Sequence, residues 1–162
     1  KKEKILKLNN KIGIIFRNYD RLIEKKMLLD LKNFCKLHKR KLFLANNFKM
    51  AVDLDLDGVY LPSFNRELGH KKYKLKKGFI ILGSAHNFKE IQQKNKQGVK
   101  FIFLSPLFKT KNYKNNLDVI RFNILSQFAK NEIIALGGIN NKNIKKLKMI
   151  KASGFSAISY FN

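Results

Sequence analysis

The chain has little cysteine and few acidic residues, and it lacks any long apolar run. Its one cysteine, Cys35, excludes an internal disulfide. Because Cys35 lies in an apolar-periodic stretch, we expect a buried thiol rather than a nucleophile. No apolar run approaches the roughly 20 residues that cross a bilayer, so we expect no membrane partner. No secretory signal is visible either, and a chain with so little cysteine fits the reducing cytoplasm.

The scarcity of acidic residues leaves a formal net charge of +24, which by itself would indicate a nucleic-acid partner. However, only five of the 35 basic residues are arginine, and asparagine is abundant, with 18 copies. An AT-biased genome would place such an excess of lysine and asparagine on any surface. The lysines are also spread over every predicted helix and loop. We therefore expect the positive field to attract phosphorylated small molecules rather than nucleic acid.

Short apolar segments alternate with helical ones along the chain. Seven strands are predicted, at 12–16, 42–45, 58–61, 79–82, 101–104, 132–136 and 155–160. Helices are predicted over 1–10, 20–37, 48–52, 87–97, 119–128 and 140–150. In the second of these, Asp20 is the expected N-cap, and the expected buried stripe includes Leu22, Met27 and Leu37.

The repeated strand–helix units define the expected fold class. Strands that are apolar on both faces indicate a parallel sheet covered on both sides. Two architectures fit, a doubly wound open sheet and a (β/α)₈ barrel. No G-x-G-x-x-G motif follows the first strand, which disfavours a dinucleotide-binding fold. With 162 residues, we expect one domain over 1–162.

The unusual chemistry follows three consecutive predicted strands. These segments are Gly-Ser-Ala-His at 83–86, Ser-Pro-Leu-Phe-Lys-Thr at 105–110 and Ala-Leu-Gly-Gly-Ile at 135–139. Parallel α/β proteins keep their ligands at the carboxyl ends of their strands. Small, hydroxyl and glycine residues there predict a small-molecule site.

The order and spacing of these segments resemble the thiamine phosphate synthase and thiazole tautomerase family, which folds as a compact (β/α)₈ barrel. Two further segments carry the resemblance, Asp-Gly-Val-Tyr-Leu at 57–61 and the closing strand from Gly154 to Ser159. On the family's layout the visible strands are the second to the eighth. The resemblance thus implies a TIM-barrel domain whose first strand and last helix are missing from this chain.

The resemblance also implies a set of substrate-binding residues. Thiazole phosphate would contact Gly137, Gly138, Ile158 and Ser159, because glycine lets main-chain amides approach a phosphate closely. Ser84 and Thr110 match positions that bind the pyrophosphate of the pyrimidine substrate, and Arg17 matches a family arginine. From the residues alone, the alternative roles are a tight turn for the two glycines, caps for the two hydroxyl residues and a surface charge for Arg17.

Two further expectations concern this proposed phosphate pocket. His86 is either an imidazole of the site or a histidine buried under the loop. Gly138→Asp should abolish phosphate binding with little loss of fold, because it adds a like charge where the anion sits.

The chain departs from the family at its metal positions. The two magnesium carboxylates fall at Asn46 and Asn65, and Mg²⁺ prefers carboxylate oxygens, so the implied Mg²⁺ cofactor should be weakened. The tautomerase's catalytic histidine falls at Pro106. An alternative cation site would use the alternating carboxylates Asp53, Asp55 and Asp57, although Asp57 matches a structural position of the family.

Family membership implies a transferase of thiamine biosynthesis that joins hydroxymethylpyrimidine pyrophosphate to thiazole phosphate. The first alternative is a noncatalytic or tautomerase-like binder of thiazole phosphate, which would explain glycines kept and carboxylates lost. The second alternative is a basic nucleic-acid-binding protein.

Overall fold

The computed structural model describes residues 5–6, 9, 12–19, 22–110 and 115–157. The chain divides into two compact units. Unit 1 comprises residues 1–61 and 69–81, and unit 2 comprises residues 62–68 and 82–162. The prediction of a single domain over 1–162 stays a prediction. No helix in the described part of the chain is long and apolar enough to span a membrane.

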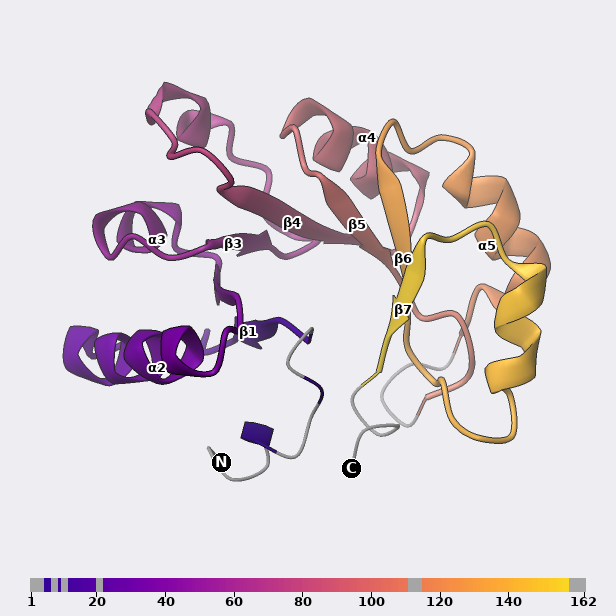
Figure 1. The fold of residues 1–162 in the computed structure, drawn as a ribbon. Helices are drawn as coiled ribbons and strands as arrows, with labels where there is room; N and C mark the ends of the chain where they lie inside the picture. Colours follow the sequence, from indigo (N-terminus) through magenta and orange to yellow (C-terminus); the bar gives the residue numbers. More distant parts are fainter. Residues whose placement is uncertain (1–4, 7–8, 10–11, 20–21, 111–114, 158–162) are drawn as a thin grey trace. The chain divides into compact units, whose positions relative to one another are not determined.

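Unit 1 consists of parallel strands with helices on one side of them (Figure 1). Its strands are β1 (Ile14–Phe16), β2 (Leu42–Ala45) and β3 (Gly58–Leu61), adjacent in chain order. Ile14 pairs with Leu42, and Phe43 pairs with Gly58. The helical segments are α2 (Lys25–Leu37), α3 (Phe48–Asp53) and the 3₁₀ segment η1 (Gly69–Lys72). Every residue of β2 and β3 is buried, which confirms strands covered on both faces.

Helix α2 shows where the periodicity was misleading. Leu28 and Cys35 are buried against the unit, and burial raises the pKa of the Cys35 thiol, as expected for an inert core cysteine. Leu22, Met27 and Leu37 are exposed, so the predicted stripe was wrong at these positions. Leu22 precedes the helix and Leu37 is its last residue. Within the helix only Leu28 and Cys35 are fully buried, so α2 packs through a narrow face. The expected N-cap, Asp20, lies outside the described residues.

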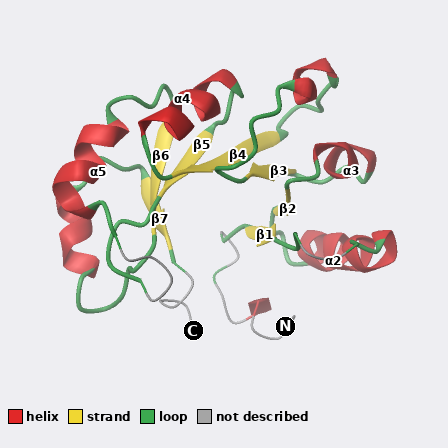
Figure 2. Cartoon of the chain, turned by 180° about the vertical axis from the view of Figure 1, so that it is seen from behind, coloured by secondary structure: helices red, strands yellow, loops and turns green. Residues whose placement is uncertain are grey.

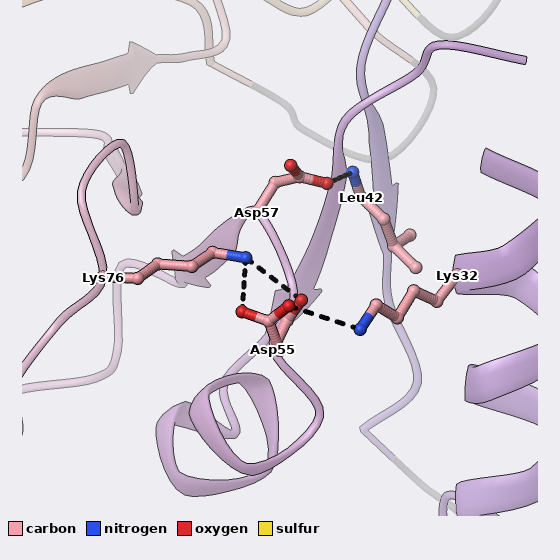
Figure 3. A network of polar contacts seen from close by, with 5 residues as sticks. All are labelled: Lys32, Leu42, Asp55, Asp57 and Lys76. Atoms are coloured by element: carbon pink, nitrogen blue, oxygen red, sulfur yellow. Dashed lines mark hydrogen bonds and ion pairs between the residues drawn. The ribbon is translucent and has the colours of Figure 1, made fainter. Parts of the chain in front are cut away.

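Asp55 and Asp57 are bonded to lysines and to the main chain (Figure 3), and Asp53 pairs with Lys49 at 2.7 Å. Asp57 Oδ2 accepts a hydrogen bond from the Leu42 amide at 2.8 Å, which ties the start of β3 to the start of β2. Asp55 pairs with Lys76 at 2.7 Å and with Lys32 at 3.5 Å. Within the described residues, no group of three or more His, Cys, Asp or Glu side chains could hold a metal ion.

Unit 2 repeats the parallel arrangement, with α4 (Phe88–Lys96) and α5 (Asp118–Ser126) on the same side of its strands (Figure 2). The strands are β4 (Ile80–Ala85), whose first two residues belong to unit 1, β5 (Phe101–Leu104), β6 (Glu132–Leu136) and β7 (Gly154–Ser156). They are adjacent in chain order. The 3₁₀ segment η2 (Ile144–Met149) completes the unit.

Two predicted boundaries in unit 2 were wrong. β4 continues beyond Leu82 to Ala85, because the small residues Gly83 and Ser84 pair with β5 and are covered there. The helix predicted over 140–150 is a shorter 3₁₀ segment, η2. Asparagine side chains bond to the main chain ahead of η2, where Asn143 Oδ1 accepts from the Asn140 amide at 2.9 Å.

The predicted start of α4 is confirmed. Asn87 Oδ1 accepts from the Glu90 amide at 3.0 Å, and Glu90 Oε1 accepts from Asn87 Nδ2 at 3.0 Å. The same carboxylate accepts from the His86 amide at 2.7 Å, so the turn between β4 and α4 is closed by one glutamate. Most of the helix predicted over 1–10, and residues 158–160 of the last predicted strand, lie outside the described residues.

Asp57→Ala should destabilise unit 1, because it leaves the Leu42 amide without its carboxylate acceptor. We expect the free energy of unfolding in urea to fall by about 1–3 kcal/mol. Asp57→Asn keeps an acceptor oxygen and should cost less. Asp55→Asn is the exposed control and should change stability by less than about 1 kcal/mol. Equal effects for Asp57→Ala and Asp55→Asn would show that the bond to Leu42 contributes nothing.

Candidate functional site

The segments 83–86, 105–110 and 135–139 lie at the carboxyl ends of β4, β5 and β6, and all three belong to unit 2. The loop of residues 105–110 follows β5 and is bonded to both neighbours. The Ser105 amide donates to Ala85 O at 3.1 Å. On the other side, the Leu107 amide donates to Leu136 O at 2.9 Å and the Phe108 amide to Gly137 O at 3.1 Å. The three chemically unusual segments are therefore brought together, as a ligand site requires.

Gly137 and Gly138 form a turn whose backbone lies directly against the 105–110 loop. Both have positive φ, +96° and +71°. A Cβ atom on Gly137 would lie 2.9 Å from Pro106 Cα, and one on Gly138 would lie 2.6 Å from Phe108 O. Glycine is thus required here both by backbone conformation and by close approach. The expectation that Gly138→Asp would leave the fold nearly intact is wrong.

His86 joins the ends of β4 and β5. Its Nδ1 lies 2.7 Å from Ser105 O and 3.2 Å from Ser105 Oγ. Because a carbonyl oxygen can only accept, Nδ1 must carry the proton, and in the neutral ring Nε2 then carries the lone pair. Ser105 itself is buried. His86 therefore has a structural role at the edge of the site, whatever else it contacts.

Besides Ser105, Thr110 and Ser84 carry hydroxyl groups in this region. Thr110 Oγ1 is buried and has no hydrogen-bond partner in the described part of the chain. Native proteins rarely leave a buried hydroxyl unbonded, and such a group calls for an explanation such as a missing ligand. Ser84 is buried near the end of β4, where it pairs with Phe103 of β5.

Several other predicted site residues belong to unit 1 or lie outside the described residues. Arg17 and Asn46 belong to unit 1. The Arg17 guanidinium lies over the rings of Tyr19, at 5.4 Å, and Tyr60, at 6.0 Å. Asn46 follows β2 with a φ of +56°, a conformation that asparagine tolerates better than most residues. Ile158 and Ser159 lie outside the described residues.

Asn65, the second magnesium position of the family, belongs to unit 2 but is engaged elsewhere. Its Oδ1 accepts from Gln97 Nε2 at 2.9 Å and from the Glu67 amide at 3.1 Å. These two bonds use both lone pairs of a neutral oxygen. Mg²⁺ prefers charged carboxylates, and the other family position is also an amide, Asn46. The residues present therefore do not fit a magnesium ion.

Sequence reasoning missed Lys94 and Gln97, two buried residues at the C-terminal end of α4. Lys94 Nζ donates to Pro62 O at 2.8 Å, Asn65 O at 3.0 Å and Gln97 Oε1 at 2.8 Å. Desolvation lowers the pKa of Lys94 to about 8, against an opposing effect of Glu90. Lys94 follows the buried Ile91 by three residues, and this spacing places both on the same face of the helix. The spacing could have indicated burial, but in a chain with so many lysines Lys94 could not be told from a surface residue.

Comparison with known structures shows the fold. A thiamine phosphate pyrophosphorylase from Pyrococcus furiosus superposes with a TM-score of 0.71 over 97% of this chain and 76% of that protein, at 18% identity. FabK from Thermotoga maritima, as its M276A mutant, superposes with a TM-score of 0.69 over 86% of this chain and 50% of that one, at 9% identity. The chain is therefore a parallel α/β protein of the TIM-barrel type.

Sequence comparison then shows the family. The family model for thiamine monophosphate synthase matches residues 5–161, so the chain belongs to this family. A thiamine-phosphate synthase of Prochlorococcus marinus is 30% identical over 130 residues, covering 75% of this chain and 36% of that protein. A putative thiamine-phosphate synthase 2 of Aquifex aeolicus is 29% identical over 138 residues, covering 84% and 74%. The chain thus spans about a third of the first relative and three quarters of the second.

Gly138→Ala should destabilise the protein through both strain and steric conflict. Gly98→Ala is the matched control, because Gly98 has nearly the same φ, +68°, and a Cβ atom there would meet nothing within 4 Å. We expect about 1–2 kcal/mol for Gly98→Ala, from strain alone, and about 1–3 kcal/mol more for Gly138→Ala. Urea unfolding of both variants measures the difference. Equal losses would show that the 105–110 loop moves aside freely.

Lys94 should make stability rise with pH in the alkaline range. Its pKa is about 8 in the fold and 10.5 in an unfolded chain, so between these values the unfolded state binds more protons. The free energy of unfolding should therefore increase from pH 8 to 10.5, by up to about 3 kcal/mol. Because other groups titrate there too, the measurement is the difference between the wild type and Lys94→Met. A difference that does not change with pH would contradict the shifted pKa.

Proposed function

We propose that this protein is a thiamine phosphate synthase-like transferase that joins hydroxymethylpyrimidine pyrophosphate to thiazole phosphate. The observation that carries the proposal is the buried, unpartnered hydroxyl of Thr110, within the described residues, on a loop bonded to the Gly137–Gly138 turn. A phosphate oxygen is an acceptor that would satisfy this hydroxyl. Membership of the family supports the choice of substrates.

In this proposal the thiazole nitrogen forms a C–N bond to the pyrimidine methylene as the C–O bond to pyrophosphate breaks. Ser84 and Thr110 donate hydrogen bonds to the leaving pyrophosphate. Main-chain amides near Gly137 and Gly138, together with Ile158 and Ser159, hold the thiazole phosphate, and Arg17 adds positive charge. Stabilising the charge that develops on the leaving group is usually the main source of rate acceleration in such a reaction.

Positive charge for this step would come from the protein's own cations. The residues at the two magnesium positions do not fit the ion, so the proposed reaction proceeds without it. The formal net charge of +24 favours attraction of phosphorylated substrates. The same proposal places the protein in the cytoplasm.

The second candidate is a noncatalytic binder of thiazole phosphate. Asn65, whose amide oxygen is already bonded to Gln97 and Glu67, favours it, because a charged metal ligand is replaced by a structural contact. Calorimetry with thiazole phosphate and with the pyrimidine pyrophosphate separates the two. Binding of both, with release of pyrophosphate on mixing, supports the transferase. Binding of thiazole phosphate alone supports the binder.

Thr110→Val tests the proposed site, because it should weaken ligand binding without lowering the stability of the fold. Because the hydroxyl has no partner in the described structure, its replacement by a methyl group should leave the free energy of unfolding unchanged or raised. Affinity for inorganic pyrophosphate, measured by calorimetry, should fall about tenfold.

Ser126→Ala is the control for this variant. Ser126 Oγ donates to Asn123 O at 2.9 Å on α5, so its loss should lower stability slightly and leave pyrophosphate affinity unchanged. If Thr110→Val binds pyrophosphate as the wild type does, the hydroxyl is not part of an anion site and the proposal loses its main support.

A further inference from the structure

The loop of residues 62–68, which follows β3, is held by side chains from one face of α4 and its C-cap. Lys94 Nζ and the Nε2 atoms of Gln97 and Gln93 are the donors. The acceptors are the main-chain carbonyl oxygens of Pro62, Asn65, Arg66 and Glu67. All of these residues lie within unit 2. The main-chain carbonyl oxygens of the loop therefore face α4, and the buried Lys94 ammonium donates to two of them.

The surroundings of the Lys94 ammonium are those of a bound cation. Three oxygens lie 2.8–3.0 Å from Nζ, two from main-chain carbonyls and one from the Gln97 amide. An ammonium group has three donors, so this set satisfies it completely. Carbonyl and amide oxygens are also ligands of hard metal ions. Unlike a metal ion, this charge is part of the Lys94 side chain and cannot dissociate from the protein.

Gly83 of β4 makes room for the stem of this lysine. A Cβ atom on Gly83 would lie 2.9 Å from Lys94 Cδ. The missing side chain on the strand thus lets an aliphatic stem pass beneath the 62–68 loop and deliver its charged end there. A full set of matching contacts around one buried cation is the signature of a specific structural role.

Asn65 bonds to α4 at the position where the family has a magnesium-binding carboxylate. The residue stands where the family has a magnesium carboxylate, yet its Oδ1 is bonded to Gln97 Nε2 and to the Glu67 amide. Its carbonyl oxygen is bonded to Lys94. Side chain and main chain of Asn65 are both part of the contact with α4.

We propose that the Lys94 ammonium, with Gln97, is the resident cation of the 62–68 loop, and that this protein binds its phosphorylated ligand without Mg²⁺. Lys94 is a positioning residue, because it acts through the loop. The first half of the proposal concerns the loop alone. The second half rests on the proposed function, since it concerns the same ligand site.

Hydrogen exchange of two loop amides tests the first half without any ligand. The Asn65 amide donates to Pro62 O at 3.0 Å and the Glu67 amide to Asn65 Oδ1 at 3.1 Å, so both report on the loop's conformation. In the wild type, protection of these amides should be the same in excess EDTA and in excess Mg²⁺. Protection that appears only with Mg²⁺ would overturn the proposal.

Variants of α4 locate the effect. Lys94→Met should lower the protection of these two amides about tenfold or more, and added Mg²⁺ should not restore it. Lys96→Met, an exposed lysine of the same helix, should leave protection unchanged. If Lys94→Met does not fold, Gln97→Met removes the amide contacts while keeping the ammonium, and should lower protection of the Glu67 amide. Unchanged protection in Lys94→Met or Gln97→Met would contradict the proposal.

Calorimetry with inorganic pyrophosphate tests the second half. The wild-type dissociation constant should agree within about twofold in EDTA and in Mg²⁺. Binding that requires Mg²⁺ would overturn metal-free binding. No binding under either condition would remove the proposed function and metal-free binding together, while hydrogen exchange would still decide the role of Lys94.

Discussion

The close approach of two stretches of main chain, the Gly137–Gly138 turn and the 105–110 loop, is the constraint on which the candidate site depends. The two are joined by amide–carbonyl bonds from Leu107 and Phe108, and neither glycine could carry a side chain without displacing the loop. The 105–110 loop also bonds to the end of β4 through Ser105. These bonds connect the ends of β4, β5 and β6 through the 105–110 loop, whose last residue is Thr110. The ligand site that we propose in unit 2 depends on this contact.

A second constraint is the buried charge of Lys94. Desolvation makes a buried ammonium unfavourable, as its lowered pKa shows, and the three acceptors offset part of this cost. The 62–68 loop supplies two of these acceptors, and Gln97 supplies the third. The loop thus has one conformation that satisfies the cation. In our proposal, the charge of Lys94 takes the place of the cation that a family carboxylate would attract, so an amide suffices at position 65.

Much of the architecture could be predicted from the chain. The strand cores at 42–45, 58–61, 101–104 and 132–136 and the Asn87 cap agree with the structure because they depend on local apolarity and local hydrogen bonding. Helix faces and strand ends were less predictable. Leu22 and Leu37 fit a helical period but lie where no strand covers them. β4 continues through Gly83 and Ser84 because β5 pairs with them, which no local preference indicates.

The sequence by itself determined the alternation of strands and helices, the family, and the segments in which ligand chemistry would be found, since these follow from residue type and order along the chain. Only the tertiary structure decided what particular residues do there. It made Gly138 a packing requirement, engaged the Asn65 side chain with Gln97 and Glu67, and buried one lysine of 30 beneath a loop. The reason is that a residue's burial and its hydrogen-bond partners are set by groups distant in sequence, and a lysine's role changes completely once water is excluded from it.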